Sequence, residues 1–116
     1  MQIQRLHVGR RLSEIAIHNE TVYLAGQIAD DTSADIVGQT REVLASVDRL
    51  LKDAGSDKTC ILMCQIFITD MALFPGMNEV WDEWVAAGHT PPRATVEANL
   101  ANPACLVEIV VTAALR

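Results

Sequence analysis

Residues 59–69 form the most apolar stretch of the chain, Thr-Cys-Ile-Leu-Met-Cys-Gln-Ile-Phe-Ile-Thr. A short, nearly continuous apolar run of this kind predicts a β-strand that is buried on both faces. Helices of the same chain can cover one of these faces. The remaining elements of the 116-residue chain are too few to cover the other. We therefore expect a partner subunit to lie against the second face.

The segment from Asp30 to Ala54 has a different periodicity. Its apolar and small residues recur at the spacing of one face of an α-helix. They are Ile36, Val37, Thr40, Val43, Leu44, Val47, Leu50, Leu51 and Ala54. Asp31, Thr32 or Ser33 can cap the start through a side-chain oxygen, and Gly55 can end the helix. We predict that this helix packs on a sheet.

Strand-like and helix-like segments alternate along the rest of the chain. Strands are predicted over residues 2–7, 13–18, 21–25, 93–99 and 105–114, and a second helix over residues 74–87. With the strand at 59–69, the order is β-β-β-α-β-α-β-β. Such an order predicts a single α+β domain over residues 1–116, with a mixed sheet that has both helices on one face.

Charge and composition exclude several classes of partner. The formal net charge is −6 and the cationic residues are scattered, so we expect no nucleic acid partner. No apolar run reaches the ~18 residues that span a bilayer. The N-terminal segment lacks the apolar core of a signal peptide. We therefore expect a cytosolic protein with no membrane partner.

The three cysteines, Cys60, Cys64 and Cys105, follow no disulfide framework. An even spacing puts Cys60 and Cys64 on one face of the predicted strand, where they should be small buried apolar side chains. The three histidines are far apart in the sequence, and it has no phosphate-binding glycine loop and no serine-hydrolase or zinc-protease motif. We expect neither a metal nor a cofactor.

Two charged residues lie where chemistry is plausible. Arg93 follows two prolines and opens a predicted strand, and its planar guanidinium can bind a carboxylate through two hydrogen bonds. A surface position or a structural ion pair explains it equally well. Glu108 lies within an apolar strand, where it either faces outward or serves as a general acid or base in a partly desolvated site. Thr95 shares a strand face with Arg93.

The sequence resembles the RidA/YjgF family over nearly its whole length. Residues 92–97, Pro-Arg-Ala-Thr-Val-Glu, and 107–109, Val-Glu-Ile, resemble the C-terminal signature of the family. Residues 22–27, Val-Tyr-Leu-Ala-Gly-Gln, resemble its strand that ends in a Ser/Ala-Gly-Gln turn, and Asn78 also fits. Residues 81–89 are most similar to the YoaB-like branch. The resemblance implies a chorismate-mutase-like fold and a homotrimer with a barrel-like core and clefts between subunits.

The resemblance also implies an activity, the hydrolysis of 2-aminoacrylate-type enamines and imines to 2-oxo acids and ammonia. These intermediates leak from pyridoxal-phosphate enzymes. Arg93 matches the arginine that binds the substrate carboxylate, and Glu108 matches the glutamate that positions or activates water. Thr95 falls where many members have a cysteine, and Gly26 falls at the glycine of the turn that lines the cleft. Leu12 stands where the archetypal branch has a tyrosine, which implies a larger or less polar substrate.

Two other functions remain open at this point. A trimer with an arginine in each cleft could bind or sense 2-oxo acids or other small carboxylates without turnover. A ribonuclease, a label often attached to this family, is disfavoured by the acidic charge and by the absence of a histidine pair at a useful spacing.

Overall fold

The computed structural model describes residues 2–116 and has the predicted order of strands and helices. The elements are β1 (Gln4–Val8), β2 (Ser13–His18), β3 (Thr21–Leu24), α1 (Ile36–Ala54), β4 (Ile61–Ile68), α2 (Phe74–Trp84), β5 (Arg93–Glu97) and β6 (Val107–Ala114), with 3-10 turns η1 (Lys58–Cys60) and η2 (Met71–Leu73). The six strands form one mixed sheet in the order β1-β2-β3-β6-β4-β5. Only the β4–β5 neighbours are parallel. The predicted α+β class is confirmed.

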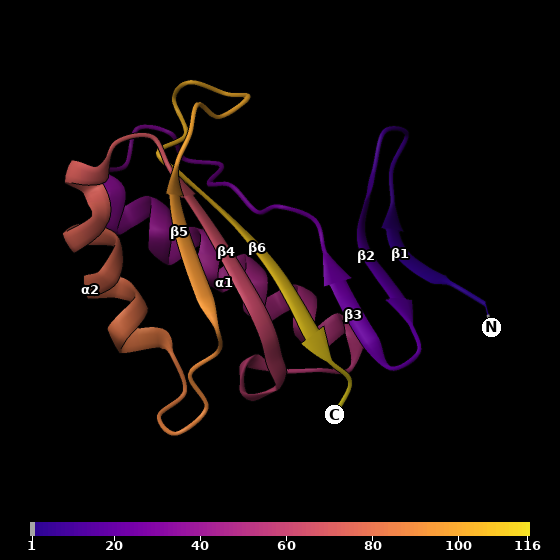
Figure 1. The fold of residues 1–116 in the computed structure, drawn as a ribbon. Coiled ribbons are helices and arrows are strands. Elements are labelled where there is room, and N and C mark those ends of the chain that lie inside the picture. Colours follow the sequence, from indigo (N-terminus) through magenta and orange to yellow (C-terminus); the bar gives the residue numbers. More distant parts are fainter. Residues whose placement is uncertain (1) are drawn as a thin grey trace.

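Both helices lie on the same side of the sheet (Figure 1). α1 crosses behind the strands, and α2 lies beside it near the β5 edge. The core lies between the helices and the sheet, and both layers contribute completely buried side chains to it. Examples are Ile15, Val47, Ile66, Met77 and Ile109. The opposite side of the sheet carries no helix, so one face of every strand is left uncovered in a single copy.

A two-residue turn joins β2 to β3, between the strands predicted at residues 13–18 and 21–25. Asn19 and Glu20 have φ angles of 51° and 66°, and His18 pairs with Thr21 across the turn. Positive φ at both central residues matches the right-handed twist of the two strands. The β1–β2 hairpin extends the sheet beyond β3, and β1 forms the edge opposite to β5.

α1 begins later than its predicted cap. Asp35, and not Asp31, Thr32 or Ser33, caps the helix, since its carboxylate accepts a hydrogen bond from the Gly38 N–H. Asp31 instead accepts hydrogen bonds from the backbone and hydroxyl of Ser33. Those local bonds make the segment a turn. Gly55 ends the helix in the left-handed conformation, with φ 86°, as predicted.

β4 is the strand predicted from the apolar run at residues 59–69, and a single copy covers only one of its faces. Ile66 and Ile68 are completely buried under the helices, whereas Leu62 and Met63 are 50% and 42% exposed. The partner that we expect on this face is not present in one chain. It therefore stays a prediction.

The prediction that Cys60 is buried beside Cys64 is wrong. Cys64 is completely buried in β4, but Cys60 lies in η1 before the strand and is partly exposed. The β4–β6 register also shifts between Ile61 and Met63, so regular alternation does not extend back to Cys60. Cys105 is also buried.

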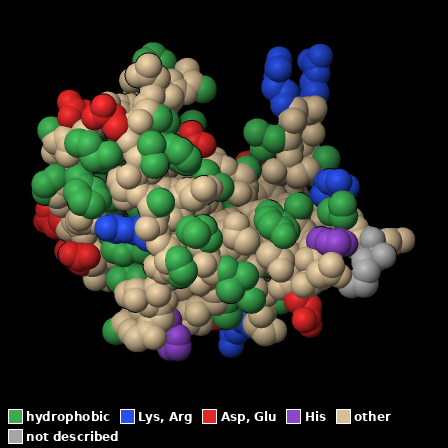
Figure 2. Space-filling model, viewed as in Figure 1, with side chains coloured by type: hydrophobic (Ala, Val, Ile, Leu, Met, Phe, Trp, Pro, Cys, Tyr) green, Lys and Arg blue, Asp and Glu red, His purple; other side chains and the backbone are tan. Residues whose placement is uncertain are grey.

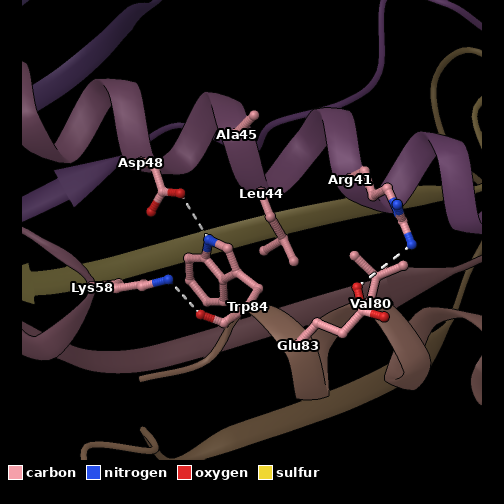
Figure 3. Close-up of a pocket in the computed structure, with 8 residues that line it drawn as sticks. All are labelled: Arg41, Leu44, Ala45, Asp48, Lys58, Val80, Glu83 and Trp84. Carbon is pink, nitrogen blue, oxygen red and sulfur yellow. Dashed lines mark hydrogen bonds and ion pairs between the residues drawn. The ribbon is translucent and has the colours of Figure 1, made fainter. Parts of the chain in front are cut away.

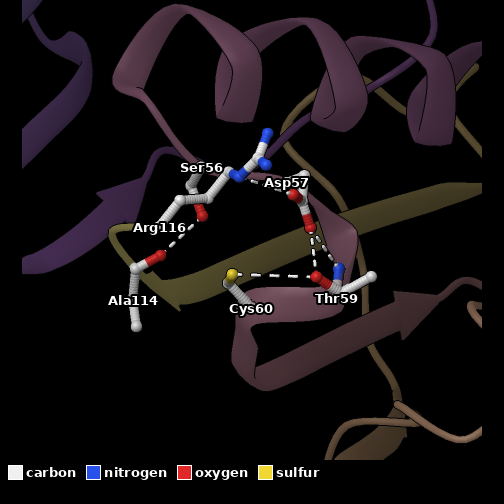
Figure 4. A network of polar contacts seen from close by, with 6 residues as sticks. All are labelled: Ser56, Asp57, Thr59, Cys60, Ala114 and Arg116. Carbon is white, nitrogen blue, oxygen red and sulfur yellow. Dashed lines mark hydrogen bonds and ion pairs between the residues drawn. The ribbon is translucent and has the colours of Figure 1, made fainter.

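Polar contacts fasten the beginning of β4 to the C-terminal end of the chain (Figure 4). The Ser56 hydroxyl donates to the carbonyl of Ala114, and Arg116 Nε lies 3.2 Å from Asp57 Oδ2. The hydroxyl and N–H of Thr59 donate to the same carboxylate, and these bonds hold the pKa of Asp57 below its usual value.

α2 ends three residues before its predicted end at Ala87. The backbone turns extended at Val85, and Lys58 Nζ donates to the freed carbonyl of Trp84. Asp70 caps the preceding 3-10 turn through the Ala72 N–H. Within residues 2–116, neither helix combines the length and the apolar character needed to cross a membrane.

Candidate functional site

Arg93 is the first residue of β5, and the register of the sheet decides which way it faces. It pairs with Cys64, whose side chain lies in the core beneath the helices, and paired residues share a face. Its guanidinium therefore meets α2. Arg93 Nη1 donates to Oδ1 of Asn78 at 2.8 Å, and the guanidinium carbon lies 5.0 Å from the ring centre of Trp81 and 5.8 Å from that of Phe74.

The partners of Arg93 are all neutral. Within residues 2–116, no aspartate or glutamate lies at ion-pair distance from it. The aromatic faces and the amide hold the guanidinium in place, yet they use few of its five N–H donors. A partly buried cation with free, fixed donors is suited to bind a carboxylate.

The cysteine beneath Arg93 is not a nucleophile. Burial raises the pKa of the Cys64 thiol to about 12, against a smaller opposing effect of the Arg93 charge. The thiol therefore stays protonated at neutral pH, and a thiol is much less reactive than a thiolate. Thr95 lies two residues after Arg93 on the same face and pairs with Ile66. This part of the molecule thus offers a cation and a hydroxyl, and no thiolate.

Glu108 lies on the other face of the sheet. Its neighbours in β6, Val107 and Ile109, are completely buried in the core, so by alternation Glu108 points to the uncovered side. It is partly buried there. A Cβ atom added at Gly26 would overlap its Oε2 and lie 2.9 Å from its Cδ. Glu108 and Gly26 are therefore in direct contact.

Leu12 lies in a third place. It belongs to the turn between β1 and β2, is 56% exposed, and stands at the edge of the sheet opposite to β5. One chain thus brings Arg93 together with Thr95 and brings Glu108 together with Gly26. It does not bring these two pairs or Leu12 to a common point.

Two residues of the Arg93 environment were not predicted from the sequence. Phe74 and Trp81 both contact Arg93, and neither was predicted to be a site residue. Asn78 fitted the family pattern but carried no role. The signal was available, because residues 74, 78 and 81 have the i, i+4, i+7 spacing of one helix face.

Apolar side chains gather on the uncovered face of the sheet (Figure 2). Tyr23 in β3, Met63 in β4 and Val96 in β5 are 50%, 42% and 48% exposed. Several large apolar side chains exposed on one face of a sheet are the kind of surface that a partner can cover. Glu108 lies on this face, within the same area as the exposed apolar side chains.

A hollow of about 320 Å³ lies elsewhere, between α1 and α2 (Figure 3). Its polar groups already pair with each other. The Trp84 indole N–H donates to Asp48 at 2.9 Å, and Arg41 lies 3.5 Å from Glu83. None of the predicted site residues lines it, and the uncompensated cation at Arg93 is the better candidate.

Comparisons with known proteins agree on one family. The family model described as Endoribonuclease L-PSP matches residues 2–115. The RutC family protein YoaB of Escherichia coli (strain K12) is 44% identical, with 99% of this chain and 100% of the relative covered. The 3-aminoacrylate deaminase RutC of Acinetobacter baylyi is 32% identical, with 76% and 74% covered. The crystal structure of a YjgF family member from Neisseria meningitidis has a TM-score of 0.97 and 43% identity, with 100% and 97% covered.

Proposed function

The chain belongs to the RidA/YjgF family, with its chorismate-mutase-like fold, and we propose that it hydrolyses the enamines and imines of small 2-oxo acids. The products are the 2-oxo acid and ammonia. The observation that carries this proposal is the partly buried guanidinium of Arg93, which Asn78, Trp81 and Phe74 hold without neutralising its charge. A relative named as a 3-aminoacrylate deaminase supports the same class of substrate.

Arg93 would bind the substrate carboxylate through two charge-assisted hydrogen bonds. These bonds fix the position of the imine carbon relative to the rest of the site. The Thr95 hydroxyl, two residues along the same strand face, would polarise the imine nitrogen. Because such imines already hydrolyse quickly in water, orientation and proton transfer suffice for useful acceleration.

Glu108 would act as the general base and then as the general acid. An enamine enters this step after it has tautomerised to the imine. Glu108 accepts a proton from water while the water oxygen bonds to the carbon of the protonated imine, and the electron pair of the C=N double bond moves to the nitrogen, which leaves a neutral amine on the tetrahedral carbon. Glu108 then returns its proton to the amine. The C–N bond breaks, ammonia leaves, and the hydroxyl loses its proton to form the carbonyl of the 2-oxo acid.

The site would be shared between two copies of the chain. Arg93 faces the helices and Glu108 faces the uncovered side of the same sheet, so one copy does not offer both groups to one substrate. We propose that the apolar uncovered face packs against other copies in the homotrimer that the family resemblance implies. The Arg93 of one copy would then meet the Glu108 of the next, with Leu12 and the backbone at Gly26 lining the cleft.

A binding or sensing trimer is the alternative, since Arg93 alone could hold a 2-oxo acid without turnover. Glu108→Ala separates the two functions, because a sensor keeps its ligand affinity and an enzyme loses its rate. Ribonuclease activity is disfavoured by the net charge of −6.

Reactive imines must be removed where they are released, and we therefore propose a cytosolic location.

The experiment generates 2-aminoacrylate and its longer homologues in situ with an excess of a dehydratase or an amino-acid oxidase and follows the 2-oxo acid. The wild-type protein should accelerate its appearance. Arg93→Lys should lower kcat/KM about ten- to hundredfold, because an ammonium cannot form the bidentate pair. The matched control is Arg41→Lys on the surface of α1, where the side chain is 56% exposed.

Two results would count against the proposal. Full activity of Arg93→Lys would exclude Arg93 as the carboxylate-binding group. If folded wild-type protein accelerates no homologue but binds 2-oxo acids in an Arg93-dependent manner, the protein is a binding module.

A further inference from the structure

We propose that Gly26 is a positioning residue, whose missing side chain provides the space in which the Glu108 carboxylate sits. This inference rests on the proposed function for its catalytic meaning. The contact itself stands on geometry. A Cβ at residue 26 would overlap Glu108 Oε2 and would lie 2.9 Å from Cδ and 3.2 Å from Cγ. Such distances are far inside the ~3.5–4.0 Å optimum for carbon atoms.

Glu108 belongs to a row of residues that crosses the uncovered face. Phe67 of β4 pairs with Glu108 on one side and with Val96 of β5 on the other. The side chains of Phe67 and Val96 are apolar, so this side of the row offers the Glu108 carboxylate no hydrogen bond. Gly26 lies on the β3 side of β6, next to Gln27, whose backbone pairs with Ile109, and its missing side chain leaves space beside the Glu108 carboxylate. The carboxylate therefore leans toward the glycine.

Packing alone fixes the carboxylate in one copy. The backbone of Glu108 pairs with Phe67, but within residues 2–116 no side chain or backbone N–H donates a hydrogen bond to its carboxylate. The free oxygens of a partly buried carboxylate are then available to water or substrate, which a general base requires. Its position depends on the surfaces against which it rests, and the Gly26 backbone is the closest of these.

The backbone does not require glycine at this position. Gly55 and Gly88 have positive φ, but Gly26 does not. Alanine could adopt its dihedral angles without strain. The reason for glycine is therefore the space that Glu108 occupies, and shortening that side chain should remove the reason.

The test is a double-mutant cycle with Gly26→Ala, Glu108→Asp and both together. Gly26→Ala should lower kcat on in-situ imines by about tenfold or more, with little change in KM, because a displacement of roughly 1 Å at a catalytic group has such an effect. In the Glu108→Asp background, the same change should alter kcat several-fold less, because aspartate has no atom at the Oε2 position that the Cβ would overlap and keeps only the 3.2 Å approach at Cγ.

Thermal unfolding separates this inference from the proposed function. Gly26→Ala should lower Tm by about 5 °C with Glu108 present and clearly less with Glu108→Asp. Equal effects of Gly26→Ala on Tm in both backgrounds, or equal effects on kcat, would overturn the proposal. If the stability cycle shows coupling while wild-type protein has no deaminase activity, the contact stands and the proposed function fails. If Gly26→Ala does not fold with Glu108 but folds with Glu108→Asp, the contact is again supported.

Discussion

Replacing Asn78 by aspartate would introduce a charge against the guanidinium without changing the shape of the site. The Asn78 Oδ1 atom lies 2.8 Å from Arg93 Nη1, and aspartate keeps that acceptor. Two opposite charges about 4 Å apart interact by about 4 kcal/mol at an effective dielectric constant of 20. Since Arg93 is partly exposed, solvent reduces the net effect to roughly 1–2 kcal/mol.

That energy opposes the binding of the substrate carboxylate. The substrate would compete with the new carboxylate at position 78 for Arg93 and would also be repelled by it. We expect Asn78→Asp to raise KM about five- to thirtyfold, while Tm stays equal or rises because the cation gains a partner. Steady-state kinetics on in-situ imines, or titration with a 2-oxo acid, measures this. Asn99→Asp, an exposed position after β5, is the charge-matched control. An unchanged KM in a folded Asn78→Asp protein would refute a carboxylate site at Arg93.

Two further predictions concern the core. Gln39 is completely buried, donates to the carbonyls of Ala34 and Ala104, and accepts the N–H of Leu106. Gln39→Leu leaves these groups unpaired and should lower the free energy of unfolding in urea by roughly 3–5 kcal/mol; a loss below about 1 kcal/mol would contradict this role. Burial raises the pKa of Cys64 to about 12 from 9.0, so between these pH values the unfolded chain loses a proton that the folded chain keeps, and stability falls as pH rises. Cys64→Ala should flatten this decline in urea titrations, and an unchanged slope would contradict it.

Local patterns predicted most of the elements. The 3.6-residue stripe of α1 and the break between the strands predicted at 13–18 and 21–25 both arise from neighbours in the sequence, and both were correct. The predicted cap of α1 was wrong because Asp31 bonds locally to Ser33, and the predicted end of α2 was wrong because of a contact between distant segments. α2 ends at Trp84, where Lys58 from another element takes its carbonyl.

The candidate site was predictable as a set of residues but not as a geometry. Arg93 and Glu108 lie on strands that a loop separates, and alternation along a strand does not carry across a loop. Only the pairing of Cys64 with Arg93 and of Phe67 with Glu108 assigns the two residues to opposite faces. The separation of Arg93 and Glu108 on opposite faces of a single copy was therefore not predictable from alternation along the sequence.

Subunit complementation tests this shared site most directly. Arg93→Ala and Glu108→Ala proteins, each inactive alone, would be unfolded together, refolded as a 1:1 mixture, and assayed for deamination. In a cyclic trimer, about one quarter of the clefts then join an intact Arg93 to an intact Glu108 of the next copy. We predict the return of roughly that fraction of wild-type activity. No recovery in a mixture proven to contain mixed trimers would contradict a site built from two copies.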